Sequence, residues 1–252
     1  MKIALFHFSP VWCDAESNLI LIIQALRAQS FVNVHLVALP EACLTGFAIG
    51  SEMKPLKNLD SELHSLALWA KETSTSVLLG AFVEEDGTTN NSMVLISGRT
   101  GKASVVYRKI NLFTFANEQE ICLPGSDLGV LEVDKVTMGL AICFDLRSVE
   151  LFDKYRKSGV HLVIVIANWP ARRQDHFTTL LRARALDMQF AIIGLNRSGS
   201  DPIVGNYVGD PLGFYPDGAA IEFERTDQFS FVELANAEIT SRNLELMRSF
   251  YD

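Results

Sequence analysis

The sequence predicts an α/β protein in which two β-sheets pack against each other between two layers of helices, a four-layer α-β-β-α sandwich. Short apolar runs alternate with segments of helical periodicity, and a β-α-β-α-β-β order occurs twice along the chain. No glycine-, serine- and proline-rich linker separates the halves. We therefore expect residues 1–252 to form one domain with internal pseudo-two-fold symmetry.

The first half begins with a βαβ unit. Apolar periodicity predicts a strand over residues 2–8, a helix over residues 18–29 and a strand over residues 34–39. Asp60 is the expected cap of a second helix, whose apolar residues recur at helical spacing: Leu63, Leu66, Ala67 and Ala70. Three strands follow, joined by turns at Asp86-Gly87 and residues 98–101: residues 77–82, 93–97 and 104–108.

The second half repeats the order. We expect a strand over residues 136–142, a helix ending near Lys157 with Gly159 as its stop, and a strand over residues 162–167. A helix over residues 175–187 and a strand over residues 190–195 come next. The last two expected strands, residues 219–223 and 230–234, follow the turn at residues 216–218.

Each predicted sheet has helices available for only one of its faces, so its other face must be buried against the other sheet. An open doubly wound sheet is the alternative. In either fold, reactive side chains gather where strands reach their carboxyl ends. Glu41 and Cys143 each follow an apolar strand and Lys109 closes another, so we expect all three at one edge.

Composition excludes several classes of protein. A formal net charge of −8 and a pI near 5.2 disfavour a nucleic-acid partner. The longest aliphatic run, residues 162–167, is too short to span a membrane. The apolar N-terminal stretch is interrupted by His7 and lacks a small-residue cleavage site, so we expect no signal peptide and a cytoplasmic protein.

The sequence gives no sign of a metal or cofactor. Its four cysteines are widely spaced and form no C-x-x-C pair, which favours free thiols over structural zinc or disulfides: Cys13, Cys43, Cys122 and Cys143. Neither a G-x-G-x-x-G nor a P-loop pattern occurs. We therefore expect no cofactor.

Cys143 is a candidate nucleophile because it ends the apolar run 136–142 and precedes an abrupt polar change. A buried structural thiol is the alternative. Histidine is the usual activating partner of a thiol, but none of the five histidines has an obvious strand-end position facing Cys143, and only His176 stays open. Glu41 is the next candidate base.

Two charged residues are placed to assist a thiol, because an adjacent cation and a base, here Lys109 and Glu41, are needed to generate a thiolate at neutral pH. Glu41 follows a buried strand, and Pro40 fixes the backbone before it, so a rigid turn presents the carboxylate. The alternative for Glu41 is a solvated strand end. Lys109 closes a strand, and a surface cation is its alternative role.

Three segments resemble the nitrilase superfamily in order, spacing and residue pattern: Pro40-Glu41, Tyr107 to Phe113, and Cys143 to Arg147. Similarity continues through residues 167–170, 182–185, 194–197 and 216–218, and so covers nearly the whole chain. Residues 167–170 and 196–199 look most like the ω-amidase branch, whose members hydrolyse the terminal amide of 2-oxo acids such as 2-oxoglutaramate. The chain departs from the family pattern at Asn111, Ser148-Val149 and Pro211.

The resemblance implies a role for each candidate residue. Cys143 is the expected nucleophile and Glu41 the general base, while Lys109 and the backbone N–H of Phe144 are expected to hold the oxyanion. Glu118 matches the position of a second carboxylate in the site, with Glu120 as the alternative. A homodimer is also implied, through the helix after Cys143 and the helix that contains Arg182.

The expected substrate carries a carboxylate, which a cation must meet. Arg172 and Arg173 follow the strand 162–167 closely, and an arginine fork suits a bidentate pair with a carboxylate. We favour Arg173 over Arg172, with solvated arginines as the alternative. Asn168 and Trp169 of the same loop complete the expected substrate pocket. A carbamoyl or nitrile hydrolase and a non-catalytic binding protein are the competing functions.

Overall fold

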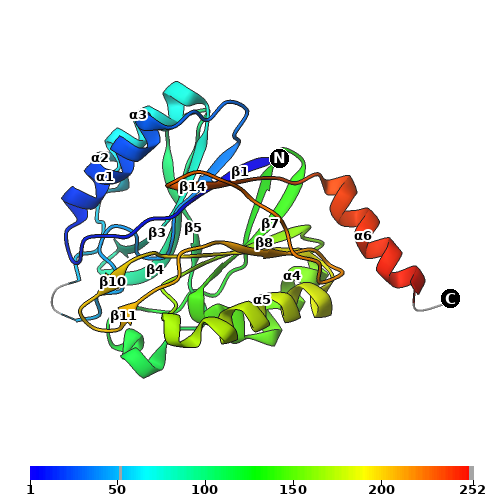
Figure 1. Ribbon diagram of the computed structural model, residues 1–252. Helices are drawn as coiled ribbons and strands as arrows, with labels where there is room; N and C mark the ends of the chain where they lie inside the picture. Colours follow the sequence, from blue (N-terminus) through cyan, green and yellow to red (C-terminus); the bar gives the residue numbers. More distant parts are fainter. Residues whose placement is uncertain (51–52, 250–252) are drawn as a thin grey trace.

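The computed structural model describes residues 1–50 and 53–249, and the side chains of residues 1–50 and 53–242. Two β-sheets lie face to face between two layers of helices (Figure 1). The first is seven-stranded, in the order β13 (Glu224–Arg225), β14 (Phe229–Glu233), β1 (Lys2–Phe6), β2 (Leu36–Ala38), β3 (Ser76–Glu85), β4 (Thr88–Ile96) and β5 (Ala103–Arg108). The second is five-stranded, in the order β12 (Leu212–Phe214), β9 (Ala191–Asn196), β8 (Leu162–Ala167), β7 (Val136–Ile142) and β6 (Gly129–Val133).

Both sheets contain three neighbouring parallel strands. In the first, β2 pairs in parallel with β1 and with β3. In the second, β8 pairs in parallel with β7 and with β9. The flanking strands are antiparallel, for example β14 against β1 and β6 against β7. The two sheets thus repeat one parallel core, as the recurrence in the sequence predicts, and the carboxyl ends of these strands carry the candidate site.

The innermost layer is an apolar core between the sheets. Along β1, Ile3 and Leu5 face this core whereas Ala4 and Phe6 face the helices, because successive side chains of a strand point to opposite faces. From the other sheet, Leu140, Ile164 and Ile193 reach the same core and are fully buried. This contact between sheets confirms the sandwich and excludes the open doubly wound sheet.

The outer layers each cover one sheet. Helices α1 (Ala15–Ala28) and α3 (His64–Thr73) pack on the seven-stranded sheet through residues such as Ile22 and Trp69. Helices α4 (Val149–Lys157) and α5 (Gln174–Met188) pack on the five-stranded sheet through Phe152 and Phe177. Within residues 1–50 and 53–249, no helix is long and apolar enough to cross a membrane.

Helix starts differ from the predictions. The first helix begins at Ala15, because the Asp14 carboxylate accepts the N–H of Ser17 at 3.0 Å and caps it. Asn18, the expected start, is buried inside the helix. Asp60 is not a cap: Asn58 caps the short helix α2 (Leu59–Glu62) through the N–H of Ser61 at 3.1 Å, and α3 then starts separately.

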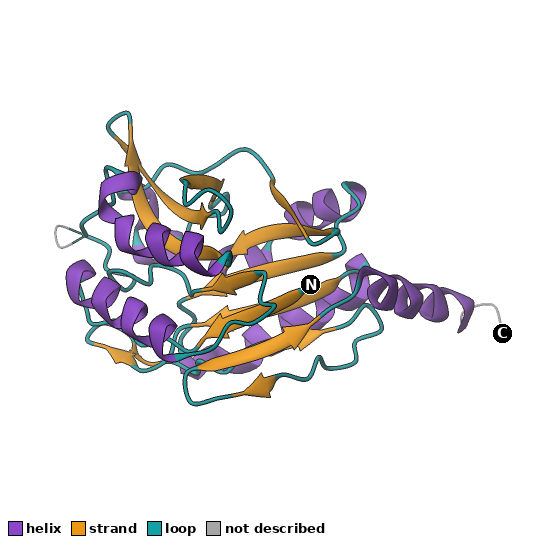
Figure 2. Ribbon diagram, turned by 90° about the horizontal axis from the view of Figure 1, so that it is seen from above, coloured by secondary structure: helices purple, strands orange, loops and turns teal. Residues whose placement is uncertain are grey.

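The C-terminal region departs furthest from prediction. The prediction of a strand over residues 219–223 is wrong. After β12 the chain turns back and forms a single β-bridge, between Phe214 and Ala220, and Ile221 then packs in the core between the sheets. The edge strands β6 and β12 were not predicted. Nor was α6 (Asn236–Ser249), which projects away from the two sheets (Figures 1 and 2).

Candidate active site

Glu41 follows β2 after Leu39 and Pro40 and is fully buried. Its backbone runs against Gly80 of β3, where a Cβ atom would stand 2.6 Å from the Glu41 Cα, so only glycine fits there. The carboxylate Oε2 accepts the backbone N–H of Asn168 at 2.7 Å, and the Asn168 amide donates to the Glu41 carbonyl. Both sheets therefore hold Glu41.

Lys109 follows β5 and is fully buried beside Glu41. Its Nζ donates to Glu41 Oε1 at 3.0 Å and to Glu118 Oε2 at 2.9 Å. Burial alone would lower the pKa of Lys109, but the charges of Glu41 and Glu118 outweigh it and raise that pKa above its usual range. Lys109 is thus held as an ammonium, and the surface-cation alternative is wrong.

Glu118, and not Glu120, lies with these residues. Glu118 opens the 3₁₀ turn η2 (Glu118–Glu120) and is fully buried, whereas Glu120 is exposed. Its Oε2 also accepts the backbone N–H of Phe113 at 2.6 Å. The turn therefore places one carboxylate beneath the pocket and turns the other to solvent.

Asn91 of β4 joins the two glutamates and was missed in the sequence. Its Nδ2 donates to Glu41 at 2.8 Å and to Glu118 at 2.7 Å, and the residue is fully buried. The signal was present: residues 88–92 form a polar run directly before the apolar residues 93–96, and together they make up β4. A buried asparagine in a strand needs partners, and here they are the carboxylates of the site.

Cys143 begins the 3₁₀ turn η3 (Cys143–Arg147) directly after β7, with a φ of 48°. The residue is half-buried, and its Sγ lies 3.9 Å from the carbonyl oxygen of Asn168. Burial, then the charge of Glu41, raise the pKa of the Cys143 thiol well above its ordinary value, and Lys109 opposes this only in part. The free site therefore holds a thiol, whereas the sequence suggested that Lys109 and Glu41 together generate a thiolate.

Asp145 fixes the turn that carries the thiol. It is fully buried and accepts hydrogen bonds from the Tyr107 hydroxyl at 2.7 Å and from the backbone N–H groups of Asn111 and Ile142 at 2.7 and 3.0 Å. Asn111, one departure from the family pattern, thus supports η3. Phe144 lies in the first turn of η3, where backbone N–H groups have no partner within the helix.

The loop after β8 forms another side of the site. Asn196, at the end of β9, holds Trp169 by accepting its backbone N–H at 2.7 Å and donating to its carbonyl at 2.8 Å. The Trp169 indole in turn donates to the Arg173 carbonyl at 2.8 Å. Asn168 and Trp169 are both buried, so the loop is rigid where it meets Glu41 and Cys143.

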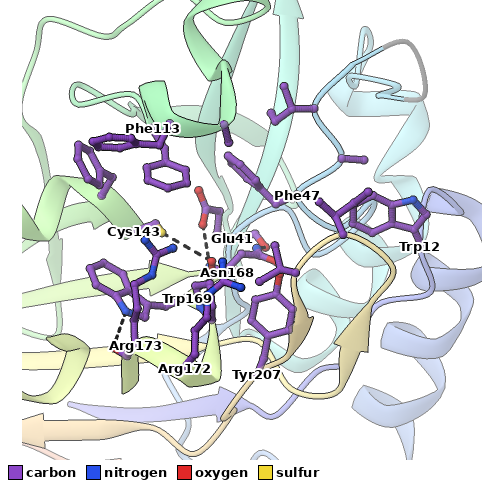
Figure 3. Close-up of a pocket in the computed structure, with 18 of the residues that line it drawn as sticks. Trp12, Glu41, Phe47, Phe113, Cys143, Asn168, Trp169, Arg172, Arg173 and Tyr207 are labelled. Carbon is purple, nitrogen blue, oxygen red and sulfur yellow. Dashed lines mark hydrogen bonds between the residues drawn. The ribbon is translucent and has the colours of Figure 1, made fainter. Parts of the chain in front are cut away.

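These residues surround one cavity of about 700 Å³ (Figure 3). Its walls include Glu41, Cys143, Phe144, Asn168, Trp169, Arg172 and Arg173, so the structure brings the predicted lining residues together. Lys109 and Glu118 are fully buried behind this surface: Lys109 contacts Glu41, and Glu118 contacts Lys109. A volume of this size lies in the range of small-molecule sites.

The two arginines differ. Arg172 is exposed, whereas Arg173 is half-buried, with its guanidinium 5.5 Å from the centre of the Phe113 ring and its Nε buried without a hydrogen-bond partner. Burial, then the charge of Arg172, lower the pKa of Arg173. An anion beside Arg173 would offset both effects.

No histidine is among the lining residues that the structure describes, and His176 is exposed, with its Nδ1 3.4 Å from Arg147 Nη2. His176 is therefore not the partner of the thiol. Among the described side chains, those of residues 1–50 and 53–242, no three of His, Cys, Asp or Glu are grouped to hold a metal ion.

A thiol, a buried carboxylate and a buried ammonium lie together at one end of the cavity, a set of groups suited to nucleophilic cleavage of an amide. Residues 2–229 match the model of the carbon-nitrogen hydrolase family. The chain belongs to this family.

Two of the curated relatives are named as amidases. The chain is 29% identical to a 2-oxoglutaramate amidase of Bacillus subtilis (strain 168) over 175 residues. This alignment covers 68% of this chain and 66% of that protein. It is 30% identical over 215 residues to omega-amidase YafV of Yersinia enterocolitica, covering 84% of this chain and 80% of the relative. Together with the family membership, the similarity to these relatives identifies the chain as an amide-hydrolysing enzyme.

Solved structures share the fold. XC1258 of Xanthomonas campestris, described as a CN-hydrolase superfamily protein with an arsenic adduct in its active site, aligns with a TM-score of 0.87 at 22% identity, over 100% of this chain and 97% of that one. An amidase of Nesterenkonia sp. AN1 aligns with a TM-score of 0.79 at 21% identity, over 99% of both chains.

Proposed function

We propose that the enzyme hydrolyses the terminal amide of a small 2-oxo acid resembling 2-oxoglutaramate, through a thioester on Cys143, and releases ammonia. One observation carries the proposal: a single cavity contains the Cys143 thiol beside Glu41 and, on the same wall as Trp169, the partly buried guanidinium of Arg173. The first group suits amide cleavage and the second suits a carboxylate. The names of the curated relatives support this substrate class.

The first step is attack by the thiol. Because the raised pKa keeps Cys143 protonated, Glu41 accepts the S–H proton while the C–S bond forms and the carbonyl electron pair moves to oxygen. Lys109 and the backbone N–H of Phe144 hold the resulting oxyanion. Protonation of Glu41 removes one negative charge from a cluster of two carboxylates and one ammonium as the oxyanion appears, so the local charge stays constant.

The second step breaks the C–N bond. The oxyanion reforms the carbonyl, the nitrogen takes the proton from Glu41, and ammonia leaves a thioester on Cys143. Water then attacks the thioester while Glu41 accepts its proton, and the departing sulfur recovers that proton as the acid is released. Glu41 thus serves both halves of the reaction.

Glu118 and Asn91 act through their neighbours. Glu118 contacts Lys109 and Asn91, and Asn91 contacts Glu41, so both fix the geometry and charge of the groups that meet the substrate. In this role they are positioning residues.

Ammonia release from three substrate types tests the proposal. 2-Oxoglutaramate, a carbamoyl amino acid and a short nitrile are compared at equal concentration with the full chain. We expect kcat/KM to be highest for 2-oxoglutaramate. A clear preference for the carbamoyl compound or the nitrile would move the chain to another substrate class of its family, and no turnover of any of the three would favour a binding protein.

We further propose that residues 1–252 form one carbon-nitrogen hydrolase domain that works as a homodimer through α4 and α5. Both helices present exposed apolar side chains, Val149 and Leu186. Sedimentation at micromolar concentration should give twice the 28.0 kDa of one chain. A single 28.0 kDa species would exclude the dimer.

A further inference from the structure

The cavity continues past the thiol to an apolar mouth, which we define as Trp12, Ile49, Phe115 and Ile203. These residues come from four separate segments of the chain, and all line the same cavity as Cys143. Phe115 is 85% exposed and Ile203 is 75% exposed, the largest values among the exposed large hydrophobic residues of the described chain. Single exposed apolar residues are common on proteins, but several gathered at one cavity indicate a binding surface.

Ile203 is held in place by a buried polar network. It lies in the turn between β10 (Ser200–Asp201) and β11 (Gly205–Asn206), and Asp201 Oδ1 accepts its backbone N–H at 2.9 Å. The Tyr207 hydroxyl donates to Asp201, and the fully buried Arg197 stacks over Tyr207 with 4.5 Å between guanidinium and ring centre. The hairpin is therefore a preorganised wall that presents Ile203 at the opening.

Phe115 is connected to the catalytic end by ring contacts. The Phe113 ring lies 5.3 Å from that of Phe144, next to the nucleophile, and 5.8 Å from that of Phe115, measured between centroids. Arg173 lies over the same Phe113 ring. An apolar surface thus begins beside the thiol and the guanidinium and ends at the protein surface.

A plain 2-oxo acid amide leaves this surface uncovered, because its short chain is polar at both ends. We propose that the site takes ω-amides whose carboxylate-bearing carbon also carries an apolar acyl or aryl substituent, as in an N-acylated ω-amide amino acid. The amide lies at Cys143, the carboxylate meets Arg173, and the substituent covers the apolar mouth. The inference rests on the proposed amidase function and adds a substrate class with a tetrahedral carbon beside the carboxylate, because the oxo carbon of a 2-oxo acid has no bond left for a substituent.

The test compares N-benzoyl-L-glutamine with N-acetyl-L-glutamine, which share the amide and the carboxylate and differ in the apolar group. We expect kcat/KM to be about tenfold higher for the benzoyl compound, the scale of discrimination by a small apolar contact. Ile203→Ser and Phe115→Ser should each reduce this ratio several-fold. Val32→Ser, at a 72% exposed aliphatic residue that does not line the cavity, should leave the ratio unchanged.

The outcomes separate the two proposals. Turnover of 2-oxoglutaramate with equal kcat/KM for the two glutamine derivatives would overturn the inference and leave the amidase function standing. If no carboxylate-bearing amide is hydrolysed, the proposed function fails, and calorimetry with Cys143→Ala decides the inference: about tenfold tighter binding of the benzoyl compound, reduced by Ile203→Ser, supports it, and equal affinities overturn it.

Discussion

The floor and the rim of the cavity are built in different ways. The floor, which we define as Glu41, Asn91, Lys109 and Glu118, is fully buried and joined by hydrogen bonds that cross between strands and turns. The rim, which we define as Phe115, Arg172, Arg173 and Ile203, lies on short turns and is exposed or half-buried. The difference suggests that the core holds the reacting groups in fixed positions, while the surface turns recognise the rest of the substrate.

This comparison predicts two kinds of kinetic effect. Interactions made only in the transition state change kcat, whereas interactions made equally in the bound state change KM. Substitutions at the floor or at Cys143 should therefore act on kcat, and substitutions at the rim on KM. A floor variant that changes only KM would contradict the division.

Loss of the nucleophile should have the largest effect. Cys143→Ala should remove turnover, by on the order of 10⁶-fold, because the covalent path is lost. Alanine at any of the other three cysteines should preserve the chemistry: Cys13, Cys43 and Cys122. Intact-protein mass spectrometry during turnover should find the acyl adduct on Cys143, and an adduct elsewhere would reject the assignment.

Substitutions that change the charge of the floor should have the second-largest effect on turnover. Glu41→Gln and Lys109→Met should each lower kcat by at least ~10²-fold, since one removes the base and the other the charge facing the oxyanion. Glu120→Gln is the matched control, because Glu120 is exposed two residues from Glu118 and should keep normal kcat. Steady-state ammonia release measures all three, and near-normal kcat in either floor variant would remove that residue from the mechanism.

A substitution at the rim should have a smaller kinetic effect, and this effect should depend on the charge of the substrate. Arg173→Ala should raise KM for an anionic substrate by about 30-fold, corresponding to ~2 kcal/mol for a charged hydrogen bond, and spare a short neutral amide. Arg172→Ala, at the exposed neighbour, should change KM less. Equal losses on charged and neutral substrates would place the carboxylate elsewhere in the cavity.

The smallest predicted effect on a reaction rate concerns the pH dependence of thiol modification. Because the pKa of Cys143 is raised, less thiolate is present at pH 7.5 than in an ordinary thiol of pKa ~8.5, and each unit of increase lowers it tenfold. Methyl methanethiosulfonate, which contains no amide, should therefore modify Cys143 at least about tenfold more slowly than a simple thiol, and faster as pH rises above 9. Cys143→Ala corrects for the other cysteines, and fast modification with a midpoint below pH 8 would contradict the raised pKa.

The sequence predicted the elements that a continuous apolar run defines. Strands β7 and β8 have the predicted bounds, because parallel strands buried on both faces are apolar throughout. Edge strand β6 was missed because it is half-exposed and its pattern is weak. The helix α6 projects from the sheets, and among its described side chains Ile239 alone is buried, which is too little to show a helical pattern.

In the site, too, only the residues with a clear local sequence pattern were predicted. Glu41, Lys109 and Cys143 were identified because each ends a strand in a recognisable segment. Asn91 and Asp145 act through partners far away in the sequence, Asn91 with Glu41 and Asp145 with Tyr107. Only the fold brings these together, the first pair across one sheet and the second pair between the two sheets. Which glutamate enters the site was likewise decided by the turn η2, because Glu118 and Glu120 differ only in the direction they face.

The backbone conformation of the nucleophile lowers the stability of the folded protein. With a φ of 48°, Cys143 lies in the left-handed region, where a residue with a Cβ loses of order 1 kcal/mol relative to glycine. Cys143→Gly should therefore melt a few degrees above Cys143→Ala, although both are inactive. The residue at position 143 that gives the higher melting temperature is thus not the one that gives turnover. Selection for thermal stability alone should therefore replace Cys143 with glycine.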